Sequence, residues 1–125
     1  PPGFEPLPAV WKEAEKIASQ THASLFLTQD PIEAVRDADV IYTDVWTSMG
    51  KEEEKEERKK IFADYQVNEQ LLQHASEQVI FMHCLPAYRG LEVTAEVIDG
   101  AKSVVFDQAE NRLHAQNAIL ASLLG

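Results

Sequence analysis

Side chains that can do chemistry follow three apolar runs of this sequence. Asp44 lies in the first run, His83 and Cys84 lie at the end of the second, and Arg112 follows the third. A carboxylate among apolar residues is costly unless it is paired. Asp44 is therefore either a cap or surface residue where a strand ends, or the partner of a cationic ligand group such as an amine. The residues alone leave both interpretations open.

His83 and Cys84 invite comparison with a nucleophilic pair. Consecutive residues of a strand point to opposite faces, however, so these two cannot readily form a dyad with each other. The alternative for Cys84 is a small buried hydrophobic residue. We predict no metal site, because the four histidines show no close ligand spacing and a single cysteine cannot build a structural zinc site.

Arg112 is predicted in the first turn of a helix, where it is either solvent-exposed or grips an anionic or carbonyl oxygen. Ser48, Met49 and Gly50 follow the first apolar run and precede a charged helix, which favours a mobile flap over a plain strand–helix connection. The sequence has no glycine-rich phosphate loop.

These side chains can act together only if the strands that precede them place them at one edge of a sheet. Four short apolar runs are typical of buried strands, and they cover residues 24–28, 39–46, 79–85 and 103–107. The runs are continuous rather than alternating, which favours a parallel sheet covered on both faces. We therefore predict an α/β fold of the doubly wound kind, in which ligands bind at the carboxyl ends of the strands.

Helices are predicted between and around these strands. They cover residues 9–20, 30–38, 51–60, 69–75, 95–98 and 110–124. Asp30, Asn68 and Thr94 are predicted N-caps, and Glu33 is expected to complete a capping box with Asp30.

Two helices carry further patterns. In the charged helix, Glu54 with Arg58 and Glu56 with Lys60 are favourable pairs four residues apart, so a solvated face is expected. The last helix carries an apolar stripe, formed by Leu113, Leu120, Leu123 and Leu124.

Composition excludes several classes of function. The 125 residues suffice for one domain, and their net charge of -10 argues against binding nucleic acid or anionic membranes. No apolar stretch is long enough to span a membrane, and no segment reads as a signal peptide. The single cysteine excludes an internal disulfide and fits a reducing compartment, so we expect a cytoplasmic protein.

Three motifs resemble those of ornithine carbamoyltransferases. Residues 44–50 resemble the DVWxSMG motif, residues 83–86 resemble HCLP, and residues 110–112 resemble the arginine element before the last helix. All three occur in the family's order with similar intervals. The resemblance implies an aspartate/ornithine carbamoyltransferase-like fold and the transfer of a carbamoyl group from carbamoyl phosphate to L-ornithine. The products would be L-citrulline and phosphate, in arginine biosynthesis.

The resemblance also implies a role for each matching residue. Asp44 and Cys84 would hold the amino groups of ornithine and help the attacking amine lose its proton. Ser48 and Met49 would contact the amino-acid end of ornithine. Leu85, through its carbonyl, and Arg112 would hold the carbamoyl group. His83 belongs to the same substrate-binding motif; the family implies a homotrimer and no cofactor.

The family's enzymes are more than twice as long as this chain. We therefore expect residues 1–125 to be part of the C-terminal ornithine-binding domain, without the N-terminal carbamoyl-phosphate domain and without strands from the middle of the sheet. Such a chain would have an incomplete sheet and no transferase activity by itself. The alternatives are a non-catalytic amino-acid-binding or regulatory module with the same fold, and a related carbamoyltransferase that uses another amine.

Overall fold

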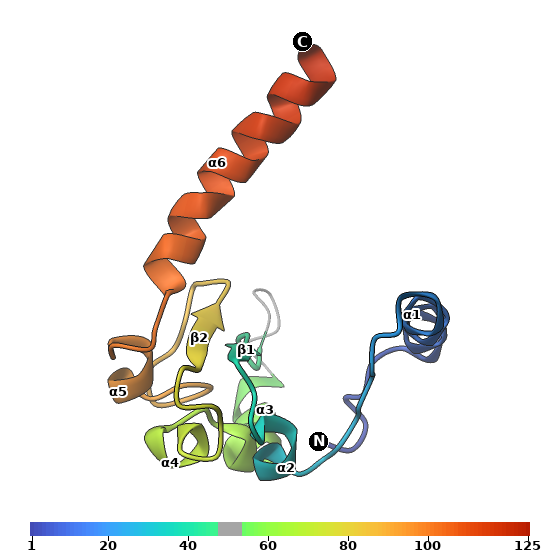
Figure 1. The fold of residues 1–125 in the computed structure, drawn as a ribbon. Helices are drawn as coiled ribbons and strands as arrows, with labels where there is room; N and C mark the ends of the chain where they lie inside the picture. The colour runs from blue at the N-terminus through green and yellow to red at the C-terminus, as the bar shows by residue number, and fades with distance from the viewer. Residues whose placement is uncertain (48–53) are drawn as a thin grey trace.

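A computed structural model describes residues 1–47 and 54–125 of the chain. Its helices precede, separate and follow two strands, as in part of an α/β fold (Figure 1). The elements are α1 (Pro8–Thr21), α2 (Pro31–Val35), β1 (Val40–Thr43), α3 (Lys55–Phe62), the 3₁₀ helix η2 (Ala63–Tyr65), α4 (Glu69–Leu72), β2 (Ile80–His83), α5 (Ala95–Ile98) and α6 (Val105–Leu124). The prediction of an incomplete parallel α/β fold is confirmed.

The sheet of the described residues consists of two parallel strands. Val40 pairs with Ile80 and Thr43 pairs with His83, so each residue of β1 lies opposite the residue forty positions later. An isolated bridge between Phe81 and Ser103 adds one pairing on the other side of β2. Because β1 and β2 run in the same direction and in this register, the residues that follow them emerge side by side at one edge.

The core packs between this sheet and the short helices. It consists of Val35, Ile41, Val67, Leu71, Leu72, Val79, Phe81, Val93, Val97, Ile98 and Val105. Phe81 and Val93 are completely buried, and Phe81 lies at the centre of β2. The core therefore lies around β2, which contributes Phe81 with Val79 just before it, whereas β1 contributes Ile41.

Two of the three predicted N-caps are confirmed. The Asp30 carboxylate accepts the N–H groups of Ile32 and Glu33, and the Asn68 side chain accepts the N–H of Leu71. The hydroxyl of Thr94 makes no such bond, although α5 does begin after it.

The predicted capping box at α2 is wrong. Glu33 does not reach back to the Asp30 amide, because the hydroxyl of Thr28 lies between them. That hydroxyl accepts the Asp30 N–H at 3.1 Å and donates to Glu33 Oε2 at 2.6 Å. The Thr28 hydroxyl therefore bridges the Asp30 N–H and the Glu33 carboxylate, which would bond directly in a capping box.

The predicted strand at residues 103–107 is wrong beyond its first residue. Phe81 N–H donates to the carbonyl of Lys102, and Val104 N–H donates to the carbonyl of Phe81, so pairing begins as in a parallel strand. The next donor, His83 N–H, instead bonds to the side-chain oxygen of Gln108 at 3.1 Å. The chain has already turned into α6 at Val105, and the side chain replaces the missing strand carbonyl.

The predicted buried strand at residues 24–28 is also wrong. No strand forms there, and Leu25, Phe26 and Leu27 are exposed. An extended segment becomes a strand only when a neighbouring strand accepts and donates its backbone hydrogen bonds. The segment and α1 lie apart from β1 in Figure 1, so no described strand is beside it. The apolar face predicted for α1 is correspondingly open, and only Ala18 is buried.

The charged helix forms as α3, with one predicted ion pair intact. Arg58 binds Glu54 at 2.9 Å, whereas Glu56 pairs with Lys59 at 2.7 Å rather than with Lys60. Arg58 also donates to the carbonyl of Trp46 at 3.1 Å. This last bond ties the helix to the segment that follows β1.

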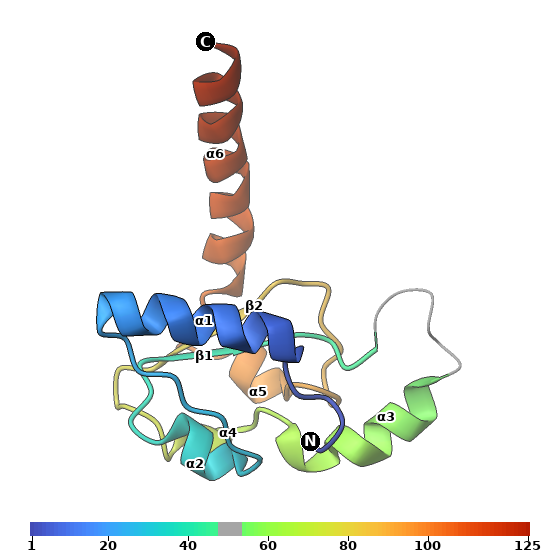
Figure 2. The same ribbon diagram turned by 90° about the vertical axis from the view of Figure 1, so that its right-hand side faces the viewer.

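The last helix begins earlier than predicted, at Val105 instead of residue 110. It projects away from the rest of the molecule in both views (Figures 1 and 2). Its apolar stripe is exposed, with Leu123 and Leu124 among the most exposed hydrophobic residues. Within the described ranges, no helix is both long and apolar enough to cross a membrane.

Candidate active site

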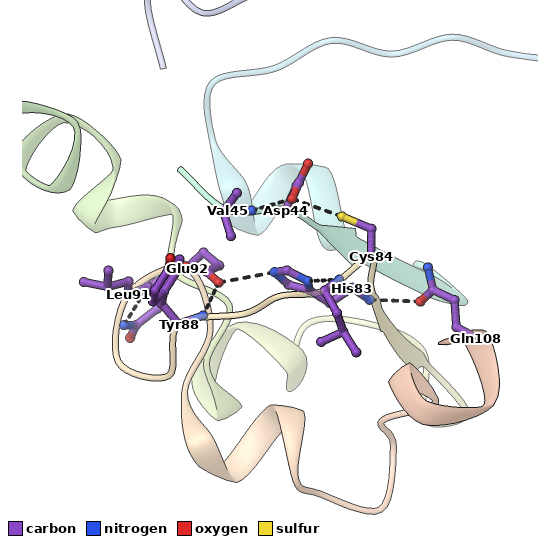
Figure 3. Close-up of polar contacts among 10 residues, drawn as sticks. Asp44, Val45, His83, Cys84, Tyr88, Leu91, Glu92 and Gln108 are labelled. Carbon is purple, nitrogen blue, oxygen red and sulfur yellow. Dashed lines mark hydrogen bonds and ion pairs between the residues drawn. The ribbon is translucent and has the colours of Figure 1, made fainter. Parts of the chain in front are cut away.

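Asp44 and Cys84 meet at the carboxyl edge of the sheet, one residue beyond β1 and β2. The thiol of Cys84 donates to Asp44 Oδ1 at 3.0 Å, and the same oxygen accepts the Val45 N–H at 2.7 Å (Figure 3). Both side chains are exposed. Among the described residues, Asp44 Oδ2 has no partner. The pair therefore presents a free carboxylate oxygen to solvent, suited to a cationic group.

The chemical state of Cys84 follows from its neighbours. The hydrogen bond to Asp44, together with partial desolvation and the negative charge of that carboxylate, raises the pKa of the Cys84 thiol. A hydrogen bond with Tyr42 acts in the opposite direction and is smaller. Cys84 is thus a protonated donor at neutral pH. The alternative of a buried hydrophobic cysteine is wrong, because the residue is exposed.

Gln108, in the first turn of α6, connects both strands at this edge. Its Oε1 accepts the His83 N–H, and its Nε2 donates to the hydroxyl of Tyr42 at 3.2 Å. Tyr42 in turn contacts the Cys84 thiol. One side chain therefore links α6, β1 and β2 around the thiol.

The His83 ring extends towards Glu92, whereas the Cys84 thiol bonds to Asp44, so the two residues form no dyad with each other (Figure 3). Its ring is buried, and both ring nitrogens are engaged: Nδ1 accepts the Leu85 N–H at 2.9 Å, and Nε2 lies 3.2 Å from Glu92 Oε1.

Ligand atoms of Asp44, His83 and Cys84 lie within 4.8 Å of one another, as in a metal-binding cluster. The hydrogen bonds of His83 leave its ring no free lone pair for a metal ion. Its two neighbours alone offer one thiol and one carboxylate, fewer ligands than a zinc site uses.

The remaining predicted site residues are placed differently. Leu85 is half-buried, with a left-handed backbone (φ 53°) and a cis peptide bond to Pro86. Arg112 lies about two turns into α6 rather than in its first turn. It is exposed, and within the described part of the chain it makes no hydrogen bond or ion pair. Ser48 and Met49 lie outside the described residues.

A groove of about 490 Å³ runs along the free edge of β1 and reaches Asp44. Thr43, Asp44 and Trp46 line it on the strand side, and Arg58 lines it on the side of α3. Its wall carries the Asp44 carboxylate and the guanidinium of Arg58, which is paired with Glu54. A small amino acid would have room there beside the free oxygen of Asp44.

Sequence reasoning assigned no role to three residues of this site: Tyr42, Glu92 and Gln108. Glu92 could have been found, because it is a carboxylate between the apolar residues Leu91 and Val93, the same signal that singled out Asp44. Gln108 lies in the stretch after the third apolar run, but only the structure shows which backbone donor it reaches. Tyr42 carries no comparable signal.

Comparison with known proteins decides the family. The model of the aspartate/ornithine carbamoyltransferase Asp/Orn-binding domain matches residues 1–123. The chain belongs to the aspartate/ornithine carbamoyltransferase family. Within that family, the ornithine carbamoyltransferase of Thermococcus kodakarensis is 61% identical over 125 residues, which are all of this chain and 40% of that protein.

Solved structures of ornithine carbamoyltransferases share the fold. The enzyme from Pyrococcus furiosus superimposes with a TM-score of 0.91 at 60% identity, over 97% of this chain and 39% of that one. The anabolic enzyme from Campylobacter jejuni gives a TM-score of 0.92 at 40% identity, over 98% and 41%. The chain thus spans about 40% of the length of the curated carbamoyltransferase that it matches.

Proposed function

We propose that these residues form part of the ornithine-binding domain of an ornithine carbamoyltransferase. The observation that carries the proposal is the pair of Asp44 and Cys84, 3.0 Å apart at the carboxyl ends of adjacent parallel strands. A free carboxylate oxygen beside a protonated thiol is a receptor for ammonium and amine groups. The position agrees with the general location of ligands in open α/β sheets.

The proposed reaction joins L-ornithine to the carbamoyl group of carbamoyl phosphate. The nitrogen lone pair of the δ-amine attacks the carbamoyl carbon, and a C–N bond forms. The bond from that carbon to the phosphate oxygen breaks, phosphate leaves with the electron pair, and the nitrogen loses a proton. The products are L-citrulline and phosphate. Positioning and charge stabilisation supply the rate increase, and no cofactor is needed.

Cys84 acts in this scheme as a hydrogen-bond donor and acceptor rather than as a nucleophile. The thiolate is the nucleophilic form of cysteine, and the Asp44 carboxylate raises the pKa of the thiol and so opposes that form. Asp44 holds a positively charged amino group of ornithine and, with Cys84, orients the δ-amine.

Other residues keep their proposed roles by the match to the family motifs. Leu85, through its backbone carbonyl, and Arg112 hold the carbamoyl group, and Ser48 and Met49 contact the amino-acid end of ornithine. His83, whose ring is buried, supports the substrate-binding segment through its hydrogen bonds. The exposed guanidinium of Arg112 is available to an incoming oxygen.

The test joins this chain to a carbamoyl-phosphate domain. In the Thermococcus kodakarensis enzyme, the region that matches this chain is replaced by these 125 residues. Citrulline formation from ornithine and carbamoyl phosphate is expected in this chimera and is lost in its Asp44→Asn variant. A chimera that folds and binds carbamoyl phosphate but forms no citrulline would overturn the proposal.

The 125-residue chain by itself is expected to be inactive, because the phosphate of carbamoyl phosphate is expected to be bound by the N-terminal domain. Citrulline made by this chain alone from the two substrates would contradict that expectation. The alternative of a non-catalytic module predicts a different outcome in the full-length protein: Asp44→Asn would leave its activity unchanged and alter the binding of a partner.

A related carbamoyltransferase that uses another amine is the remaining alternative. Comparing ornithine, putrescine and acetylornithine as acceptors in the chimera distinguishes it, since we expect ornithine to be preferred. We further propose an anabolic role in arginine biosynthesis, a cytoplasmic location and a homotrimer for the complete enzyme. The anabolic name of the Campylobacter jejuni relative supports the first of these.

A further inference from the structure

A buried acid and a buried imidazole lie directly behind the proposed site. His83 ends β2, and Glu92 lies nine residues later, in the loop that leads to α5 (Figure 3). The side chain of His83 is 0% exposed and that of Glu92 is 1% exposed. Burying such groups is costly unless their polar atoms are hydrogen-bonded, and the proposed transfer reaction uses neither of them directly.

The hydrogen bonds determine where the ring proton of His83 lies. A backbone N–H can only donate, so the bond from Leu85 N–H to Nδ1, at 2.9 Å, requires Nδ1 to be unprotonated. The proton is therefore on Nε2, which donates to Glu92 Oε1 at 3.2 Å. The imidazole is neutral in this arrangement. Neither nitrogen remains for a substrate or for proton transfer to Cys84.

Glu92 also holds the far end of the same loop. Its Oε1 accepts the Tyr88 N–H at 2.6 Å in addition to the bond from His83. The carboxyl group thus joins the end of β2 to a backbone group five residues further along the chain. Between these two points lies Leu85, whose left-handed backbone (φ 53°) is unfavourable for a residue with a side chain.

We propose that Glu92 is a positioning residue of this site. Glu92 accepts a hydrogen bond from Nε2–H of His83 and thereby fixes the tautomer in which Nδ1 is unprotonated. Nδ1 can then accept the hydrogen bond from the Leu85 N–H, and this bond sets the turn that places Cys84 beside Asp44. The inference rests on the proposed function, since Cys84 and Leu85 are the residues assigned to substrate. The role requires an acceptor oxygen at position 92, and it does not require a negative charge.

A proton relay from Glu92 through His83 to Cys84 is a different mechanism, and the geometry opposes it. The Cys84 thiol donates to Asp44, and both ring nitrogens of His83 are already engaged, Nδ1 by the Leu85 N–H and Nε2 by Glu92. The groups that hydrogen-bond to the thiol are Asp44 and Tyr42, both from the end of β1, while a ring nitrogen of His83 lies within 4.8 Å of it without a proton or lone pair to spare. Glu92 is thus expected to affect the thiol only through the position of the backbone.

The test uses the 125-residue chain, in which Cys84 is the only cysteine. The variants are Glu92→Gln, which retains the acceptor oxygen, and Glu92→Ala, which removes it. The matched controls are Glu96→Gln and Glu96→Ala, because Glu96 is an exposed glutamate in the first turn of α5. Two quantities are measured: the tautomer of His83, by ¹⁵N NMR of its ring, and the pH dependence of Cys84 alkylation by iodoacetamide.

The wild type is expected to show the Nε2–H tautomer, and Glu92→Gln should keep both the tautomer and the alkylation profile. In Glu92→Ala, the thiol leaves Asp44 and its pKa falls. Alkylation below that pKa should then be at least about threefold faster, because the rate follows the thiolate fraction. The Glu96 variants should match the wild type.

Three results would overturn the inference: an Nδ1–H tautomer in the wild type, Glu92→Gln behaving like Glu92→Ala, or a Glu92→Ala profile equal to that of the wild type. If Glu92→Ala does not fold, the wild-type ring and the Glu92→Gln profile decide the question. None of these measurements uses transferase activity. A chimera without citrulline formation would therefore overturn the proposed function and leave this result in place.

Discussion

The thiol of Cys84 and the carboxylate of Asp44 control each other's chemistry. The carboxylate raises the pKa of the thiol, and the thiol occupies one of the two carboxylate oxygens. Neither effect depends on any residue outside this chain. The ionisation of the single cysteine therefore reports directly on whether the edge of the sheet is assembled.

Asp44→Asn is expected to lower the pKa of Cys84 towards its ordinary value. An amide removes the negative charge that disfavours the thiolate, so the thiolate fraction at neutral pH rises and alkylation by iodoacetamide becomes faster. The control is Asp64→Asn, because this substitution removes the same charge at an exposed position in η2. An unchanged profile in Asp44→Asn would contradict the assigned contact.

At the scale of single residues, sequence reasoning located the strand ends but not all of their partners. Asp44 and Cys84 could be predicted to share an edge because parallel strands end together. The hydrogen bonds of the His83 ring could not be read from the pattern, since they depend on Glu92, nine residues away in a loop. Long-range partners of this kind leave no periodic signal.

Two of the helices that form where expected, α2 and α4, begin at a side-chain cap, whereas α1 and α5 form without one. Asp30 and Asn68 each bond backbone N–H groups of the first turn, and such local chemistry can be read from a few neighbouring residues. The segments predicted wrongly, 24–28 and 103–107, are apolar runs whose state depends on a neighbouring strand. Residues 103–107 have the composition of a strand, and tertiary contacts override that preference.

Asn68→Ala is expected to reduce the free energy of unfolding by about 1 kcal/mol, because the Leu71 N–H loses its acceptor at the start of α4. The control is Asn117→Ala, an exposed position within α6, where alanine favours the helix and no loss is expected. Urea denaturation of both variants measures the difference. Equal midpoints would show that the cap contributes nothing.

At the scale of the whole molecule, the side chains around β2 form a buried core, whereas those along α6 are exposed. Phe81 is fully buried in it, whereas Phe106 is 70% exposed at the start of α6. The two phenylalanines therefore compare a complete core with an open surface in one chain.

Phe81→Ala is expected to lower the free energy of unfolding by about 3–5 kcal/mol, since it leaves a cavity at the centre of the core. Phe106→Ala should change it by no more than about 0.5 kcal/mol. Urea denaturation followed by circular dichroism tests both. Similar losses for the two variants would mean that the core is not centred on β2.

The exposed apolar side chains of α6 are expected to promote association between copies of the chain in solution. Leu113, Leu120 and Leu124 lie along one stripe, and each is more than half exposed. Exposed apolar patches of this kind favour association between protein surfaces. We expect the 125-residue chain to associate as its concentration rises.

Leu120→Lys should weaken this association at least about tenfold, because a charge would have to be buried with the stripe. Ala118→Lys, which adds the same charge on the opposite face of α6, should have little effect. Sedimentation velocity over a range of concentrations measures both. Equal effects of the two variants would indicate that net charge, not the stripe, controls association.

The carboxylate beside Cys84 also has a consequence for the durability of the protein. Peroxide oxidises cysteine through the thiolate, so a thiol that Asp44 keeps protonated is oxidised slowly even though it is exposed. With no second cysteine in the chain, a sulfenic acid at this position could not be rescued by an internal disulfide. The carboxylate that we propose to orient an amine would therefore also protect the site from irreversible oxidative damage.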